Sequence, residues 1–191
     1  MNHPFEQDII QALKALKKGG TILYPTDTVW GIGCDATNEE AIRKIITIKQ
    51  RDAKQGMIIL VAEEKQILQF VAAPGLAVFD YIKQQANPTT IIFDDAIGLP
   101  ASLIYEDGSI GIRIVQDEFC RHLIKRFGKP LVSTSANISG HSPPQNFSEI
   151  SSEIKDSVDY IIQWRRDDQT PSQPSKILKW RNDGSITVIR P

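Results

Sequence analysis

Residues Leu131 to Pro144 read L-V-S-T-S-A-N-I-S-G-H-S-P-P. Two apolar residues that favour β-structure begin the stretch, and five polar side chains then fall within seven positions: Ser133, Thr134, Ser135, Asn137 and Ser139. The pattern predicts a buried strand that opens into a polar loop. Hydroxyl, amide and backbone N–H groups at a strand end can hold phosphate oxygens or a ribose, so the loop is a candidate nucleotide site. Ordinary loops, however, have the same composition.

A second polar stretch, Pro25 to Asp35, reads P-T-D-T-V-W-G-I-G-C-D and follows a short apolar strand predicted over residues 21–24. The proline ends that strand, and three polar residues come directly after it: Thr26, Asp27 and Thr28. The two glycines of G-I-G would let the backbone approach a ligand closely. A plain turn explains the same residues. The third glycine of a dinucleotide-binding fingerprint is missing, which argues against a Rossmann fold.

Two basic residues, Lys49 and Arg51, follow an amphipathic helix predicted over residues 41–48, which Thr37 or Asn38 can cap. Side chains at positions i and i+2 share a face on an extended segment and not on a helix. The pair therefore converges only if the helix has ended. A lysine and an arginine that converge would form an anion clamp, and the alternative is a solvated basic helix end.

Arg113 lies in the stretch S-I-G-I-R-I-V, residues 109–115. Isoleucines alternate there with Ser109, Gly111 and Arg113, which predicts a strand with one buried face. The arginine would then point to solvent or into a cleft. A lone arginine on a strand is usually a surface group, so by itself it is a weak indication of a ligand site.

Length and composition are those of an ordinary globular protein. The 191 residues are 41% hydrophobic and 24% charged, which favours a single domain over residues 1–191. A net charge of −1 gives no overall reason to expect nucleic-acid binding. Cys34 and Cys120 form no C-x-x-C pair and indicate neither a disulfide framework nor a zinc site. Without a secretory leader or a long apolar run, we expect a cytoplasmic protein with no membrane partner.

The remaining periodicity predicts an α/β (α+β) fold. Helices are expected over residues 5–16, 62–71, 76–85, 117–127 and 148–154, and strands over 56–62, 89–93, 158–162, 175–178 and 186–189. A hairpin turn at residues 182–184 would join the last two strands. Because several strand connections are short, we expect a mixed sheet rather than a purely parallel one. The polar segment 165–174 is expected to be mobile.

Four motifs taken together resemble one family. P-T-D-T-V-W-G-I-G, K-Q-R, S-I-G-I-R and S-T-S-A-N-I-S-G stand in the order and at the distances typical of the YrdC-like family, the threonylcarbamoyl-AMP synthases. The resemblance extends from about Ile9 to the last strand. Each motif alone is weak, and the combination is specific. It implies one YrdC-like domain with a twisted mixed sheet, flanked by helices, around a large concave cleft.

The resemblance also implies an activity. Members of the family join L-threonine, bicarbonate and ATP into threonylcarbamoyl-AMP and release pyrophosphate, so the protein would be a nucleotidyltransferase. This is the first step towards threonylcarbamoyladenosine in tRNA. Expected partners are the three substrates and the proteins that transfer the threonylcarbamoyl group onward, and direct contact with tRNA is left open. Mg²⁺ would accompany ATP, although no acidic motif marks its ligands on the protein.

Residue roles follow from the resemblance where the motifs match. Lys49 and Arg51 would be the catalytic pair that contacts the ATP phosphates. The other residues on the nucleotide side would be Ser109, Ser133, Ser135, Asn137 and Ser175. Threonine would be held by Thr26, Thr28 and Arg113, with the arginine gripping its carboxylate. In-line adenylation needs positioning and charge neutralisation, so no Ser-His-Asp triad is expected, and His3 and His122 are interpreted as surface or helix residues.

The chain also departs from the family pattern. Residues 85–90 read Q-A-N-P-T-T where a W-P-G-P type of turn is common, which puts the shape of that cleft wall in question. Gly56-Met57 and the end at Pro191 resemble the short branch without an added C-terminal domain. Two other functions stay open: an RNA-binding module of the same fold, and a carbamoyltransferase domain like that of hydrogenase maturation proteins. No zinc-finger or acylphosphatase segment favours the latter.

Overall fold

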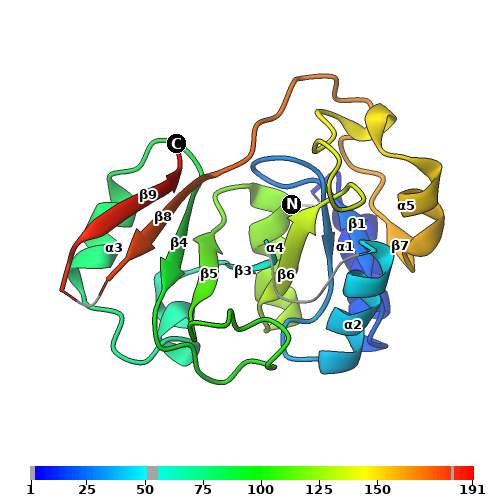
Figure 1. Cartoon of the computed structure of the whole chain (residues 1–191). Coiled ribbons are helices and arrows are strands. Elements are labelled where there is room, and N and C mark those ends of the chain that lie inside the picture. Colours follow the sequence, from blue (N-terminus) through cyan, green and yellow to red (C-terminus); the bar gives the residue numbers. More distant parts are fainter. Residues whose placement is uncertain (1–2, 51–55, 182) are drawn as a thin grey trace.

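The computed structural model describes residues 3–50, 56–181 and 183–191. Within them, nine strands form one sheet in the order β7-β1-β2-β6-β3-β5-β4-β8-β9 (Figure 1). The strands are β1 (Ile22–Tyr24), β2 (Gly31–Gly33), β3 (Ile58–Val61), β4 (Thr89–Phe93), β5 (Ile110–Ile114), β6 (Leu131–Ser135), β7 (Tyr160–Ile161), β8 (Lys176–Trp180) and β9 (Ile186–Arg190). The α-helices are α1 (Glu6–Lys17), α2 (Glu39–Ile48), α3 (Ala77–Lys83), α4 (Glu118–Phe127) and α5 (Ser152–Ser157).

The sheet is mixed, as the short strand connections predicted. β1 pairs with β7, β3 with β5 and β4 with β8 in parallel, and the other neighbours are antiparallel. Helices flank it, and Figure 1 shows α4 behind β6. The α/β fold class is therefore confirmed.

The hydrophobic core includes the middle strands of the sheet. β3 and β6 supply fully buried aliphatic side chains, among them Ile59, Leu60, Leu131 and Val132. Each such side chain stabilises the fold by about 1.5–3 kcal/mol relative to exposure. β6 pairs with β2 on one side and with β3 on the other, so the strand that opens the S-T-S-A-N loop is held from both sides.

Side-chain caps start two helices, and the first of them was predicted from the sequence. The Asn38 side chain accepts a hydrogen bond from the backbone N–H of Ala41 and caps α2. Asp117 accepts from the N–H of Cys120 at the start of α4, and Gly128 ends that helix in the left-handed region at φ 77°.

Two stretches differ locally from their interpretation in the sequence. The G-I-G tripeptide, for which a plain turn was one explanation, is strand β2, which lacks the alternation of apolar side chains that usually marks a strand. The helix predicted over residues 148–154 is split into a short 3₁₀ helix, η2 (Phe147–Glu149), and α5. Ile150 is extended between them, and Ser151 caps the second helix.

The other differences are smaller. Residues 62–71 form a 3₁₀ helix, η1 (Glu64–Gln69), with a capping box between Glu63 and Gln66. The polar segment 165–174, expected to be mobile, is tied down by hydrogen bonds: Ser172 Oγ donates to the Gln145 carbonyl over 2.7 Å. No helix in the described residues is long and apolar enough to cross a membrane.

Candidate active site

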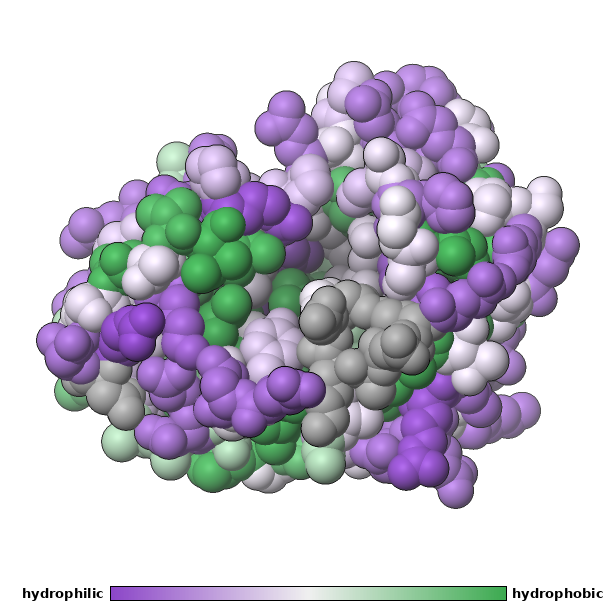
Figure 2. Space-filling model, in the orientation of Figure 1, coloured by the Kyte–Doolittle hydropathy of each residue, from purple (hydrophilic) through white to green (hydrophobic). Residues whose placement is uncertain are grey.

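A cavity of about 570 Å³ opens on the sheet, within the range of ligand sites in proteins. Figure 2 shows this face hollowed near its centre. The cavity lies where β6, β3, β5, β4, β8 and β9 approach the turn after β1. Motifs that are far apart in the sequence therefore meet around one space.

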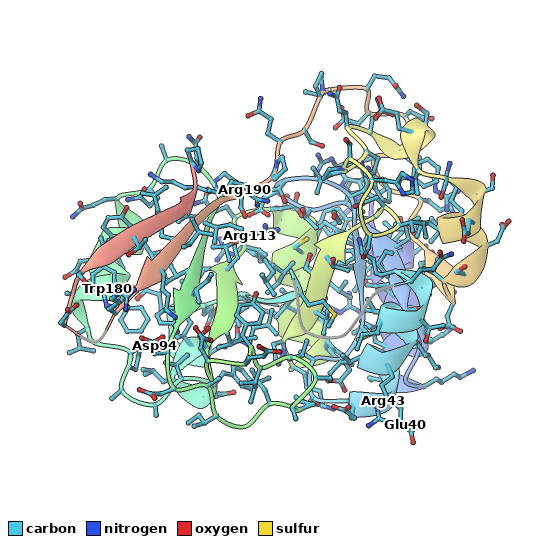
Figure 3. All side chains as sticks on the ribbon, in the orientation of Figure 1. Glu40, Arg43, Asp94, Arg113, Trp180 and Arg190 are labelled. Atoms are coloured by element: carbon cyan, nitrogen blue, oxygen red, sulfur yellow. The ribbon has the colours of Figure 1, made fainter. Side chains whose placement is uncertain are left out.

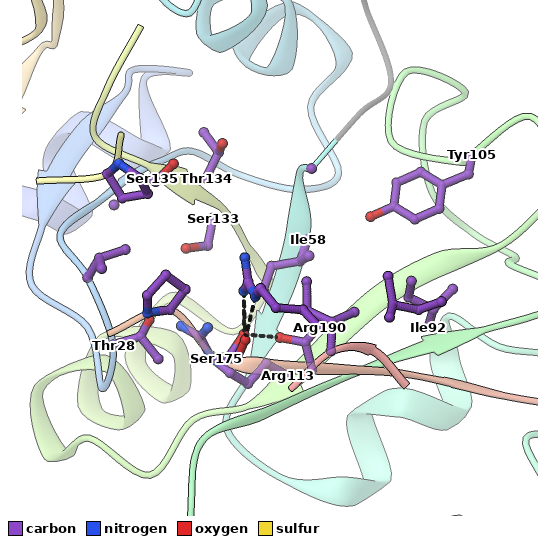
Figure 4. Close-up of a pocket in the computed structure, with 18 of the residues that line it drawn as sticks. Thr28, Ile58, Ile92, Tyr105, Arg113, Ser133, Thr134, Ser135, Ser175 and Arg190 are labelled. Carbon is purple, nitrogen blue, oxygen red and sulfur yellow. Dashed lines mark hydrogen bonds between the residues drawn. The ribbon is translucent and has the colours of Figure 1, made fainter. Parts of the chain in front are cut away.

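The cavity has a polar wall and an apolar wall. The polar wall carries hydroxyl groups from the turn after β1 and from β6: Thr28, Ser133, Thr134 and Ser135. The apolar wall comes from β3, β4, β8, β9 and the loop before β5: Ile58, Ile92, Ile177, Ile189 and Tyr105. Figure 4 shows Arg113 and Arg190 between the two walls.

Arg113 projects from β5 into this cavity and is only 4% exposed. Its Nη2 lies 3.1 Å from Asp27 Oδ1, and Asp27 is itself buried. The Nε–H of Arg113 is buried without a hydrogen-bond partner in the described part of the chain. A buried donor without a partner is costly, so the guanidinium is suited to receive an anionic ligand.

The turn between β1 and β2 is built by Thr26. Its hydroxyl accepts from the Thr28 N–H over 3.0 Å and donates to the Val29 carbonyl over 2.8 Å. Of the two threonines predicted to hold the substrate threonine, only Thr28 lines the cavity. Thr26 instead shapes the turn that presents it.

Of the residues predicted as nucleotide contacts at the end of β6 and in the loop after it, some line the cavity and one does not. Ser133 and Ser135 line the cavity, as the resemblance implied. Asn137 does not, because its amide N–H₂ donates to the carbonyls of Ile138, over 2.9 Å, and His141, over 2.7 Å. The role of Asn137 as a nucleotide-side contact stays a prediction. The Asn137 side chain ties its own loop together.

Lys49 caps the end of α2 and is 2% exposed. Its Nζ donates to the Ser135 carbonyl over 2.6 Å and lies 3.5 Å from Asn137 Oδ1. The helix has ended, as the anion clamp requires, but Lys49 is in the right-handed helical region and Gln50 has φ 49°, so the segment is not extended. Lys49 thus supports the end of β6 from outside the cavity wall. Arg51 lies outside the described residues.

The two remaining serines also differ. Ser175 lines the cavity, and its hydroxyl lies 2.8 Å from that of Thr90. Ser109 lies outside the wall, because its N–H and hydroxyl both donate to Asp107 Oδ1. It stands in the turn before β5, and its role as a nucleotide contact stays a prediction.

The comparisons with known proteins agree on one family. Residues 14–191 match the model of the Sua5/YciO/YrdC family, described as "Telomere recombination". The chain belongs to this family. It is 33% identical over 181 residues to a threonylcarbamoyl-AMP synthase of Idiomarina loihiensis, covering 92% of this chain and 95% of that one. A threonylcarbamoyl-AMP synthase of Pseudoalteromonas translucida is 31% identical over 82% of this chain and 86% of its own.

Solved structures of the Sua5/YciO/YrdC family share the fold. P. abyssi Sua5 complexed with L-threonine superposes with a TM-score of 0.86 at 22% identity, over 100% of this chain. The chain spans 55% of the length of that protein. E. coli YciO gives a TM-score of 0.84 at 22% identity, over 99% of this chain and 91% of its own. The family resemblance inferred from the four motifs is confirmed.

Arg190 is a charged cavity residue of this family member that the sequence analysis did not predict. Its Nε and Nη2 donate to the Ser175 carbonyl over 2.9 and 2.7 Å, and Figure 3 shows it near Arg113. Partial burial, and then the positive charge of Arg113, lower the pKa of Arg190. No ion pair joins Arg190 to a carboxylate among the described residues, so no direct carboxylate contact neutralises its charge. Only the pairing of β9 with β8 brings it there.

The cavity wall offers little to a resident metal ion. Its carboxylates are Glu106 and Asp107. Asp107 Oδ1 accepts from Ser109, and Oδ2 accepts from Lys179 Nζ over 2.7 Å. These bonds hold the pKa of Asp107 down to about 2, with the lysine contact as the larger cause. Both oxygens of Asp107 therefore already have partners within the protein.

Proposed function

We propose that this protein is a threonylcarbamoyl-AMP synthase, a nucleotidyltransferase that joins L-threonine, bicarbonate and ATP and releases pyrophosphate. The observation that carries the proposal is a single cavity with a hydroxyl-rich wall, an apolar wall and two arginines between them. Its similarity to threonylcarbamoyl-AMP synthases over most of the chain supports the same reaction. The product would pass to proteins that transfer the threonylcarbamoyl group in the cytoplasm.

In this proposal ATP lies along the cavity from the apolar wall to the hydroxyl groups. Ile92, Ile177 and Tyr105 offer the flat apolar surface that an adenine ring needs. Ser133, Ser135 and Arg190 offer hydroxyl and guanidinium donors for the phosphates. Lys49 would act on the phosphates through the strand end it supports, and Arg51 is proposed as a direct phosphate contact.

Threonine would lie beside Arg113 and Thr28. The free Nε–H of Arg113, together with its Nη groups, suits a carboxylate, and Asp27 holds the guanidinium in place. The Thr28 hydroxyl can bond to the amino acid's own hydroxyl. The substrate's amino group would then face the rest of the cavity, where bicarbonate and ATP meet it.

The chemistry asks for positioning more than for acid–base groups. The threonine amine attacks bicarbonate, water leaves, and an N-carboxylate forms. An oxygen of this carboxylate attacks the α-phosphorus of ATP, and the bond to pyrophosphate breaks as the new P–O bond forms. The arginines would stabilise the charge that develops on the phosphates. Mg²⁺ bound to ATP would neutralise phosphate charge when present.

The test is pyrophosphate release from ATP with each substrate omitted in turn. We expect release to need both threonine and bicarbonate, and mass spectrometry to detect threonylcarbamoyl-AMP. Glycine should support far less release, because Thr28 and its neighbours would lack a hydroxyl partner. Release that needs carbamoyl phosphate instead of bicarbonate would contradict the proposal and favour a carbamoyltransferase.

A further inference from the structure

Two histidines and a glutamate gather on the surface outside the cavity: His3, Glu118 and His122. Their donor atoms all lie within 4.8 Å of one another. His3 precedes α1, whereas Glu118 and His122 lie one turn apart on the same face of α4. We propose that these three residues bind a divalent transition-metal ion, and that zinc fits them best.

The distances are close to those of a tetrahedral zinc site. His3 Nδ1 lies 3.2 Å from Glu118 Oε1, and His122 Nε2 lies 3.9 Å from the same oxygen. Ligand atoms about 2.0–2.2 Å from zinc in a tetrahedron are roughly 3.3 Å apart. Small side-chain rotations therefore close the three groups around an ion, and water completes the fourth position.

The two imidazole rings are held near this geometry by aromatic packing. The His3 ring stacks on Phe5 with centroids 5.0 Å apart and an interplanar angle of 9°. Phe5 is buried in the core, and its centroid is also 5.7 Å from that of His122. A site whose ligands are already positioned has less conformational entropy to lose when the ion binds. The side chains stay partly exposed, so an ion can enter.

The two imidazoles and one carboxylate also determine which ion the site prefers. Imidazole nitrogens suit zinc, nickel and cobalt, whereas magnesium prefers oxygen ligands. Both cysteines of the chain are buried and do not compete for the ion in the folded protein. The other interpretation is a simple surface contact between His3 and Glu118, which contributes little to stability.

Calorimetric titration of the untagged full chain with zinc chloride tests the site. We expect one zinc ion per chain, unaffected by excess magnesium. His122→Ala and Glu118→Gln should each weaken zinc binding at least roughly tenfold, because the loss of even an outer-shell partner of a metal ligand has an effect of that size. His141→Ala, which removes the histidine of the loop after β6, is the matched control and should bind zinc like the wild type.

Two further measurements distinguish a specific metal site from non-specific binding of the ion to surface groups. Cobalt should give the strong visible absorption of a four-coordinate ion in the wild type and not in His122→Ala. Zinc should raise the melting temperature of the wild type and of His141→Ala only, since the ion links the segment before α1 to α4. Equal zinc affinity in the wild type and His122→Ala, or equal weakening by His141→Ala, would overturn the proposal. Melting without metal verifies that each variant folds.

Discussion

Arg190 shows how much one residue on the last strand contributes to the cavity. Its guanidinium is held by the Ser175 carbonyl and repelled by Arg113, and both effects leave it ready for an anion. Arg113, in contrast, has Asp27 as a fixed partner. The two arginines are therefore suited to different ligands: Arg113 to a positioned carboxylate, and Arg190 to a more highly charged phosphate chain.

Arg190→Ala should weaken ATP binding at least roughly tenfold, because a hydrogen bond to a charged group contributes about 1.5–3 kcal/mol. The ATP affinity of Arg190→Lys should lie between that of the wild type and that of Arg190→Ala, since lysine keeps the charge and loses the forked guanidinium. Calorimetry with ATP measures the effect. Arg181→Ala, in the β8–β9 connection and outside the cavity, is the control. ATP affinity that stays unchanged in Arg190→Ala would count against the proposed phosphate contact.

Asn137 is expected to affect stability more than ligand contact. Asn137→Ala removes two hydrogen bonds to loop carbonyls and should lower the free energy of unfolding by about 1–2 kcal/mol. For a chain of this length that is a decrease in melting temperature of roughly 2–8 °C. Thermal unfolding measures it, with Asn87→Ala as an exposed control. An unchanged melting temperature with lost activity would instead support Asn137 as a ligand contact.

At the scale of elements, β2 has little space for side chains, because atoms of the neighbouring strands lie close to its two glycines. A Cβ atom on Gly33 would lie 2.5 Å from the Val132 carbonyl oxygen and 2.7 Å from the Tyr24 ring. On Gly31 it would lie 3.1 Å from Ser133 Oγ, at the edge of the cavity, and 3.3 Å from the Thr134 carbonyl oxygen, so the contacts are less severe than on Gly33. The two glycines thus have different roles. Gly33 lets β1, β2 and β6 approach closely, and Gly31 leaves space at the cavity wall.

Alanine at these two positions should therefore separate folding from activity. Gly33→Ala should destabilise the protein by about 1–3 kcal/mol or more, because the backbone of β6 must move. Gly31→Ala should lower the free energy of unfolding by less than about 1 kcal/mol, because the Ser133 side chain can move. It should also reduce pyrophosphate release, because the added methyl group enters the cavity wall. Urea unfolding and the release assay on both variants test this. The reverse pattern would show that Gly31 has no role in the cavity.

The elements show which features were predictable from sequence. β4 has the predicted bounds, and α2 begins at the predicted cap Asn38, because alternation and capping are local signals. β2 was not predicted, because two of its three residues are glycines and give no alternation of apolar and polar side chains. Thr28, Arg113 and Ser133 reached the cavity wall as the family resemblance implied. Arg190 was not foreseen, because the place of β9 depends on its register with β8, which includes an irregularity at Ile177.

At the scale of the whole molecule, ion pairs join segments that are distant in the chain. Lys179 of β8 lies 3.0 Å from Asp94 Oδ1 and 2.7 Å from Asp107 Oδ2. The pKa of Asp107 is lowered to about 2, and the pKa of Lys179 is raised by the same contact. The pairing thus connects the strand beside β9 to the turn before β5.

The pH dependence of stability should report this pairing. The contribution of Asp107 is present above its unfolded pKa of about 4 and is lost as pH falls towards about 2. Lys179→Gln should therefore lower the free energy of unfolding at neutral pH, by less than about 1 kcal/mol because Asp107 is exposed, and the difference should fade as pH nears 2. Urea unfolding at several pH values measures it, with Lys176→Gln as control. A difference that does not change with pH would contradict this account.

The position of Arg190 on β9 also has a consequence for the order of synthesis. A ribosome makes β1 and the turn with Thr28 early, and it makes β9 only after every other strand of the described sheet. A nascent chain can therefore assemble the Arg113 and Thr28 end of the cavity well before Arg190 emerges. On the proposed function, an unfinished chain lacks this phosphate contact, so efficient ATP consumption must wait until translation has passed β9 and this strand has paired with β8.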